Sequence, residues 1–256
     1  KKEIVVNGYV YPNINIDTLY ASLPYLTYLS IFSYHATENG SLSAVNDKEL
    51  IGLAFEQGTG PFMTITNMND DGFSTDLAHT ILSNQQIQNT LIENILIEAE
   101  FKGFTGINID FEYIAPADKE LYNEFIRKIA GIMHQNNYLL STSLAPKTYK
   151  DQPGTLYEAH DYAVHGLYAD YVILMTYEWG YSYGPPMAVA PVNQVERVIS
   201  YAVSEIPSEK ILMGIPNYGY DWTLPYVQGT KARSLSNTMA RELAREKGVE
   251  IQFDEV

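Results

Sequence analysis

Short apolar runs recur along the chain, and the gaps between them are long enough to hold a helix. Each run has the length of a strand and is bounded by proline, glycine or polar residues, which is typical of buried strands. Strands separated by helix-length segments indicate βα units and a parallel sheet. The runs expected to form strands cover residues 4–10, 28–34, 62–66, 106–112, 138–144, 171–176 and 211–215.

Several of the gaps carry helix signals. Ser83 can cap a helix with Gln86 three residues on, and an apolar stripe at four-residue spacing follows. Asp118 is a good N-cap for a second helix with an apolar stripe of its own. Further helices are expected over residues 16–23, between Pro191 and Pro207, and over residues 236–247.

The length of the chain suits one barrel. Its 256 residues match an α/β barrel, which commonly runs to about 250 residues. Residues 217–222 are aromatic and loop-like, and a last short strand, residues 249–253, follows the seventh strand after about 30 residues, longer than a usual βα connection. The sequence therefore predicts an α/β fold, a TIM (β/α)8 barrel in one domain (1–256), with a small α+β insertion at about 217–256. Either residues 249–253 form the eighth strand or the chain stops before it, and we expect the second.

Polar and apolar residues alternate over residues 106–113. Because side chains of a strand alternate between its faces, Asn108, Asp110 and Glu112 share one face, about 7 Å apart in succession. They would be poor core residues, since burying a carboxylate without partners costs several kcal/mol. The alternation alone fits either a functional site or the solvated face of an exposed strand.

Composition narrows the range of partners. A formal net charge of −15 and a pI near 4.6 argue against nucleic acid and anionic membrane surfaces as binding partners. Proteins bind both through clustered lysine and arginine. No run approaches the roughly 20 apolar residues of a membrane span. A neutral ligand is favoured, and the 21 tyrosines suit both cores and sugar-binding clefts.

Cofactor and metal chemistry find no support in the sequence. There are no cysteines, so neither a disulfide framework nor a thiolate metal site can form. The five histidines lack metal-ligand spacing and are expected to be ordinary surface or packed residues, and no glycine-rich phosphate loop is present. We therefore expect no cofactor and no metal. The chain opens directly into a strand-like run without a secretory signal, as an excised domain would.

The run Gly106-Ile107-Asn108-Ile109-Asp110-Phe111-Glu112 resembles the active-site strand of the family-18 glycoside hydrolases, whose motif is D-G-x-D-x-D-x-E. It departs from the motif at Thr105 and at Asn108, which stand where aspartates are usual. The resemblance implies that Glu112 is the catalytic acid and that Asp110 orients the 2-acetamido group of the sugar. Family 18 uses substrate assistance, in which the acetamido oxygen attacks the anomeric carbon and configuration is retained. Asn108 can hydrogen-bond to Asp110 but cannot share a negative charge.

The segment from Met175 to Trp179 resembles the family's M-x-Y-D motif. The resemblance implies that Tyr177 hydrogen-bonds the acetamido carbonyl and that Met175 lines the pocket floor. Glu178 replaces the usual aspartate and reaches one methylene further. Simple packing is the alternative interpretation of this strand end.

Aromatic residues near the strand ends are candidates for stacking on sugar rings. For each of them a place in the core is an equal alternative. Tyr9 and Asn67, which end the first and third predicted strands, are further candidates. The stacking candidates are Trp179, Tyr218, Tyr220 and Trp222.

Four segments together are similar to the spore-associated branch of family 18, whose members resemble N-acetylglucosaminidases that degrade cortex peptidoglycan. This resemblance implies a spore or cell-wall location and LysM-type repeats ahead of the domain, of which none is present. Family barrels also carry a small α+β insertion and a tryptophan on the eighth strand, and no tryptophan follows Trp222. The segments are residues 109–113, 175–180, 184–188 and 218–225.

Three functions remain open at this point. The first is a hydrolase of β-1,4 bonds at N-acetylglucosamine in peptidoglycan, and the second is a chitinase or endo-N-acetylglucosaminidase with the same residues. The third is a barrel that binds N-acetylglucosamine polymers without cleaving them, against which the retained Glu112 argues. In each case the expected partner is a polysaccharide, and we expect a monomer.

Overall fold

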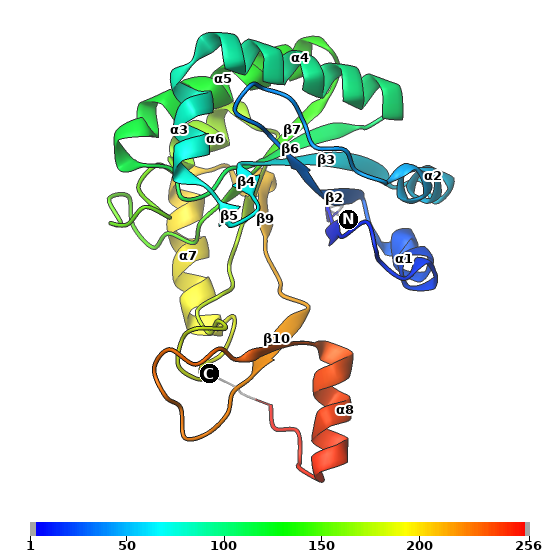
Figure 1. The fold of residues 1–256 in the computed structure, drawn as a ribbon, viewed down its shortest axis with the longest axis vertical. Helices are drawn as coiled ribbons and strands as arrows, with labels where there is room; N and C mark the ends of the chain where they lie inside the picture. The colour runs from blue at the N-terminus through cyan, green and yellow to red at the C-terminus, as the bar shows by residue number, and fades with distance from the viewer. Residues whose placement is uncertain (1–3, 254–256) are drawn as a thin grey trace.

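Seven parallel strands form one sheet in a computed structural model that describes residues 4–253. The strands follow each other in chain order, and every strand pairs in parallel with the next. The sheet curls as in a (β/α)8 barrel, which confirms the predicted fold class (Figure 1). The strands are β1 (Asn7–Val10), β2 (Tyr28–His35), β3 (Gly60–Thr66), β6 (Gly106–Asp110), β7 (Leu139–Leu144), β8 (Tyr171–Leu174) and β9 (Ile211–Met213).

Every connection between neighbouring strands of this sheet carries at least one helix, as βα units require. The helices lie along the outer side of the curled sheet (Figure 1). Among the described residues, none of the helices combines the length and the apolar character that a membrane crossing needs. The helices are α1 (Ile16–Ser22), α2 (Lys48–Glu56), α3 (Thr75–Ser83), α4 (Gln85–Lys102), α5 (Lys119–Gln135), α6 (Tyr162–Tyr168) and α7 (Val192–Glu205), with 3-10 turns at Leu23–Tyr25, Pro116–Asp118 and Ser208–Lys210.

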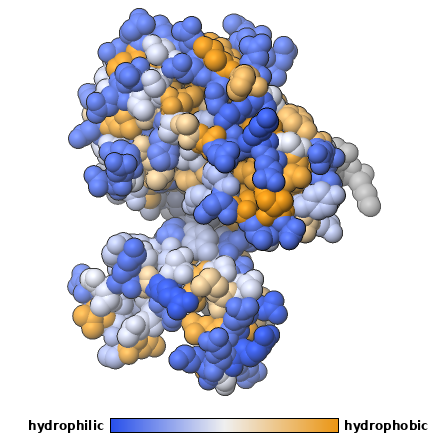
Figure 2. Space-filling model, turned by 45° about the vertical axis from the view of Figure 1, so that its right-hand side comes forward, coloured by the Kyte–Doolittle hydropathy of each residue, from blue (hydrophilic) through white to orange (hydrophobic). Residues whose placement is uncertain are grey.

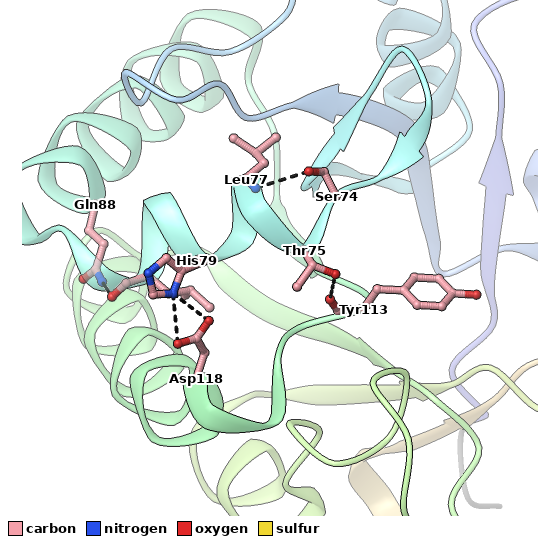
Figure 3. A network of polar contacts seen from close by, with 8 residues as sticks. Ser74, Thr75, Leu77, His79, Gln88, Tyr113 and Asp118 are labelled. Carbon is pink, nitrogen blue, oxygen red and sulfur yellow. Dashed lines mark hydrogen bonds and ion pairs between the residues drawn. The ribbon is translucent and has the colours of Figure 1, made fainter.

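Two helix starts differ from the sequence prediction. Ser83 is the last residue of α3, and the cap of α4 is Asn84, whose Oδ1 accepts from the backbone N–H groups of Gln86 and Ile87 at 2.9 and 3.2 Å. Asn84 has the extended backbone that a capping residue needs, whereas Ser83 is still helical. The sequence does not predict α2, α3 or α6. Ser74 caps α3 (Figure 3).

Asp118 stands at the start of α5 but does not cap it with its side chain. The 3-10 turn that ends at Asp118 leads straight into the helix, so the backbone there is not extended and the carboxylate cannot reach the helix N–H groups. Instead both carboxylate oxygens lie 2.9 and 3.1 Å from Nδ1 of His79 (Figure 3). The pair ties α3 to α5.

The α+β insertion is present and forms the smaller lower lobe in Figure 2. It consists of the antiparallel strands β10 (Tyr218–Asp221) and β11 (Arg233–Ser236) and of the helix α8 (Asn237–Lys247). Two sequence predictions for this part of the chain are wrong. Residues 218–221 were expected to be a loop but pair with β11. Residues 249–253 were expected to be a strand but have no regular structure, since they have no strand partner among the described residues. The described residues thus contain no eighth barrel strand.

Packing of β6 on α5 decides which side chains of β6 face the barrel interior. The ring of Phe111 stacks on Tyr122 and Phe125 of α5, with centroids 6.1 and 5.8 Å apart. Because side chains alternate along an extended chain, Asp110 and Glu112 point the other way. Gly106 begins β6, and a Cβ there would lie 2.4 Å from the ring of Phe62, so only glycine fits.

A buried charge network joins the end of α4 to the segment before α2. Nζ of Lys102 lies 2.7 Å from Oδ1 of Asp47 and 2.7 Å from the hydroxyl of Tyr34, which in turn donates to Asp47. Asp47 and Tyr34 are both buried. The network ties the C-terminal end of α4 to the residue that precedes α2.

We expect Lys102→Met to lower the free energy of unfolding by about 3 kcal/mol, because it leaves the buried Asp47 carboxylate without its cation. The matched control is Lys48→Met on the exposed surface of α2, with an expected change below about 0.5 kcal/mol. Urea denaturation measures both variants. Equal stability losses in the two would contradict this account.

Candidate active site

Asp110 and Glu112 stand at the carboxyl end of β6, where barrels carry their functional groups. Asp110 is only 4% exposed, and its Oδ1 is buried without a hydrogen-bond partner among the described residues. Glu112 follows two residues later and is half-buried. A buried acceptor without a donor is costly, so Oδ1 of Asp110 is suited to receive an N–H or O–H from outside the chain.

The surroundings raise the pKa of both carboxyls. Burial raises the pKa of Asp110 to about 7, and the nearby Ser143 hydroxyl lowers it in part. Burial also raises the pKa of Glu112 well above its usual range, and the negative charges of Asp110 and Glu178 raise it further. The negative charge of Asp110 disfavours ionisation of Glu112, so the two carboxyls do not lose their protons independently. One group can therefore act as an acid while the other is charged.

Asn108 lies one position deeper on the same strand face and is fully buried. Its Oδ1 accepts from the hydroxyls of Tyr9 at 3.0 Å and Ser143 at 3.2 Å, and its Nδ2 donates to Ser141 at 3.0 Å. The expected hydrogen bond from Asn108 to Asp110 is not formed, because these three hydroxyls take up the amide. Asn108 and Tyr9 thus form the floor under the carboxyls.

Tyr177 follows β8 and is half-buried. Burial raises its pKa well above the usual range, and the charges of Tyr9, Asp110 and Glu112 contribute. The hydroxyl therefore keeps its proton at any physiological pH and can donate a hydrogen bond near the two carboxyls. Met175 is buried just before it, in agreement with a place in the floor.

Glu178 connects the barrel to the insertion. It has a left-handed backbone with φ 68°, and its Oε1 accepts from the hydroxyls of Tyr218 at 2.6 Å and Tyr220 at 2.7 Å. Its carboxylate thus fixes β10 against the end of β8. The side chain of glutamate is one methylene longer than that of aspartate, and this length brings Oε1 to the two tyrosine hydroxyls.

Aromatic rings continue in a row from Tyr177 along β10. The centroid distances are 6.4 Å from Tyr177 to Tyr218, 5.9 Å from Tyr218 to Tyr220 and 5.7 Å from Tyr220 to Trp222. Nε1 of Trp222 donates to the carbonyl of Gly184 at 3.0 Å, which also ties the insertion to the loop after β8. The row connects Tyr177 at the end of β8 with the strand β10 of the insertion.

Trp179 is placed apart from this row. It is partly buried and packs against the core cluster of Val172, Leu174, Val198 and Ala202 between β8 and α7. This packing agrees with the alternative that Trp179 is a core residue and does not stack on a sugar ring. The predicted site residues thus form two contact groups, Tyr9 with Asn108 and Glu178 with Tyr218 and Tyr220. Trp179 packs in the core instead.

Three residues near Asp110 or the backbone around Glu112 are not recognised as candidates from the sequence: Ser143, Thr75 and His160. Oγ1 of Thr75 donates to the carbonyl of Tyr113 at 2.6 Å (Figure 3), and Tyr113 has a left-handed backbone with φ 54°. The sequence predicts an ordinary surface or packed histidine at position 160, and His160 is buried. No residue pattern marks any of the three, because their roles depend on contacts distant in sequence. Within residues 4–253 no group of acidic or histidine side chains is arranged to hold a metal ion.

Comparison with known proteins identifies the family. The model of glycosyl hydrolases family 18 matches residues 18–255. The chain belongs to this family. It is 43% identical to the cortical fragment-lytic enzyme of Bacillus subtilis over 100% of its own length and 61% of that protein's length. Among solved structures, the spore cortex-lytic enzyme SleL of Bacillus cereus matches with a TM-score of 0.93 and 40% identity, over 98% of this chain and 60% of that one.

A more distant solved structure shares the fold. A chitinase from Chromobacterium violaceum matches with a TM-score of 0.89 and 24% identity, over 98% of this chain and 80% of that one. At this identity the match supports the fold alone. The chain spans about three fifths of the length of the cortex-lytic relatives.

The charge of Glu178 gives a direct test of the electrostatics of this family-18 site. We expect Glu178→Gln to lower the pKa of Glu112, because it removes one of the negative charges that raise it while the amide oxygen still accepts from Tyr218 and Tyr220. Carboxyl carbon NMR titration measures the pKa. Glu124→Gln on the exposed face of α5 is the control and leaves it unchanged. An unchanged or higher pKa in Glu178→Gln would contradict the assigned cause.

Proposed function

We propose that this chain is the catalytic part of a glycoside hydrolase that cleaves β-1,4 bonds at N-acetylglucosamine in spore-cortex peptidoglycan. The observation that carries the proposal is the pair of Asp110 and Glu112, both with a raised pKa and with an unpartnered buried oxygen on Asp110. Membership of family 18 and the similarity to cortex-lytic proteins support it. A location at the spore or the cell wall follows from this substrate.

In the first step Glu112 acts as the general acid. It gives its proton to the glycosidic oxygen, while the acetamido oxygen of the same sugar attacks the anomeric carbon and the bond to the leaving sugar breaks. The product is an oxazolinium ion with the leaving chain released as an alcohol. The raised pKa of Glu112 favours the protonated form that this step requires.

Asp110 and Tyr177 act on the acetamido group in this step. Oδ1 of Asp110, which has no partner among the described residues, accepts the acetamido N–H, and the carboxylate stabilises the positive charge that develops on the ring. The Tyr177 hydroxyl donates to the acetamido carbonyl and holds its oxygen toward the anomeric carbon. Neither residue forms a covalent bond to the sugar.

In the second step water opens the oxazolinium ion. Glu112, now ionised, takes a proton from the water as it attacks the anomeric carbon, and the C–O bond to the acetamido oxygen breaks. The enzyme regains its protonated Glu112, and two inversions at one carbon leave the configuration retained. Tyr218, Tyr220 and Trp222 offer ring faces to neighbouring sugars of the bound chain.

Parallel digestion separates this function from its alternatives. Full-length protein is incubated with purified cortex peptidoglycan and with chitin oligomers, and mass spectrometry follows the products. Faster release from peptidoglycan supports the proposal, whereas faster cleavage of chitin oligomers assigns the protein to the chitinases. Binding to both polymers without cleavage of either would identify a recognition domain and refute the proposal.

A further inference from the structure

The backbone pairing of β6 ends before the proposed acid. Toward β3 the last pair is Asp110 with Thr66, and toward β7 the last pair is Ile109 with Thr142. Glu112 therefore lies beyond the sheet on both sides. A segment that extends beyond a sheet has no strand partners for its peptide groups, and nothing in the sheet fixes the position of its side chains.

Two side chains replace the missing strand partners. The peptide group between Phe111 and Glu112 donates its N–H to Oδ1 of Asn67 at 2.9 Å, and its carbonyl accepts from Nε2 of His160 at 2.9 Å. Asn67 also donates from Nδ2 to the next carbonyl, that of Glu112, at 2.9 Å, and to the carbonyl of Ser74 at 3.0 Å. The amide of Asn67 thus bridges both backbone groups of Glu112.

The two side chains come from the neighbouring barrel units. Asn67 is the residue directly after β3 and is fully buried. His160 is 1% exposed and accepts from the backbone N–H of Ala145, the residue directly after β7, through its Nδ1 at 2.8 Å. Asn67 therefore extends the pairing of β3 past the end of the sheet. His160 does the same for β7 through its contact with Ala145.

The partners of His160 fix its protonation. Since a backbone N–H can only donate, Nδ1 must be the unprotonated nitrogen, and Nε2 carries the hydrogen that is given to the carbonyl of Phe111. Burial lowers the pKa of His160 to about 4 in agreement with this neutral form. The ring thus works as a fixed donor and acceptor over the range in which the pair of carboxyls titrates.

We propose that Asn67 and His160 are positioning residues for Glu112, which they hold at the reacting point by taking the place of absent strand partners. This inference rests on the role proposed for Glu112. Displacing a catalytic group by about 1 Å can cost about a hundredfold in rate, so a fixed backbone at this position has a direct effect on the chemical step.

Asn67→Ala tests the first residue. We expect kcat to fall between about tenfold and a hundredfold with KM changed less than about threefold, because the acid is displaced while the sugar contacts remain. The matched control is Asn69→Ala in the antiparallel hairpin of β4 (Met68–Asn69) and β5 (Gly72–Phe73). Oδ1 of Asn69 accepts from the backbone N–H of Asp71, and the variant keeps the parent kcat. A folded Asn67→Ala protein with the parent kcat would overturn the proposal.

A double-mutant cycle separates positioning from a general structural role. If Asn67 acts through Glu112, Asn67→Ala causes no further loss of rate in a Glu112→Gln background. Losses that multiply in the double variant would mean that Asn67 acts independently of the acid and would overturn the proposal.

A pair of amide variants tests His160. The amide nitrogen of His160→Gln can occupy the place of Nε2 and donate to Phe111, whereas the shorter side chain of His160→Asn cannot reach that carbonyl. We expect kcat of His160→Gln to exceed that of His160→Asn by about tenfold, at similar KM. Equal kcat in the two variants would contradict the role of this hydrogen bond.

Hydrogen exchange of the Glu112 amide tests the inference without any activity. Asn67 protects this amide in the parent, so Asn67→Ala should accelerate its exchange at least about tenfold, and Asn69→Ala should not. Unchanged exchange would overturn the proposal. If the parent cleaves no polymer while the exchange behaves as expected, the hydrolase function fails and the backbone support of Glu112 stands.

Discussion

Glu112→Gln should lower the rate of glycan cleavage by about a thousandfold or more, because the amide can neither give a proton to the leaving oxygen nor take one from water. The change preserves the size and shape of the side chain. Binding of the glycan is therefore expected to persist, with a dissociation constant within a few-fold of the parent value. Initial rates on peptidoglycan fragments and equilibrium binding to the same fragments measure the two quantities.

The matched control for this variant is Glu93→Gln, a carboxyl on the exposed face of α4. It should cleave at the parent rate, which shows that removal of one negative charge from the protein has no effect by itself. A Glu112→Gln protein that retains a tenth or more of the parent rate would contradict the assignment of the acid.

Asp110→Asn should make the protein more stable at pH 8 and nearly inactive. Asp110 has an ordinary pKa of 3.8 and a folded-state pKa of about 7, so the folded protein binds this proton more tightly than the unfolded chain. The stability that the proton supplies is complete below about pH 4 and is lost as the pH rises to about 7. Asparagine remains neutral and avoids that loss, by up to about 4 kcal/mol at 1.36 kcal/mol per pKa unit.

Urea denaturation between pH 5 and pH 8 measures this effect. The stability gain of Asp110→Asn should increase with pH and level off above about pH 7, while cleavage falls by about a hundredfold because the charge on the oxazolinium ion is no longer balanced. A gain that is the same at every pH, or a loss of stability at pH 8, would contradict the raised pKa. The variant would also demonstrate that the site is maintained at the expense of stability.

The barrel could be predicted because its strands are short, largely apolar or alternating runs separated by helix-length segments. All seven predicted strands are present within a few residues, and the alternation around Asp110 correctly separates the face of Phe111 from the face of the carboxyls. The glycine of the motif, Gly106, also has a structural reason, because a Cβ at this position would collide with the ring of Phe62.

Elements that depend on distant partners could not be predicted. The strand β10 reads as a loop in sequence because its pairing partner β11 lies beyond a long turn, and residues 249–253 read as a strand although they pair with nothing that the structure describes. The same holds at the site. Asn67 and His160 carry no motif, and their contact with Glu112 appears only when three strand ends meet at one edge of the barrel.

The most direct test of the proposed cleavage identifies the sugar at each newly formed chain end. Full-length protein digests cortex peptidoglycan, borohydride reduces the new ends, and mass spectrometry identifies them. Cleavage assisted by the acetamido group of N-acetylglucosamine predicts N-acetylglucosaminitol in the parent digest and none above background with Glu112→Gln. N-acetylmuramitol as the main product would contradict the proposal, because it places the cut on the other sugar of the repeat.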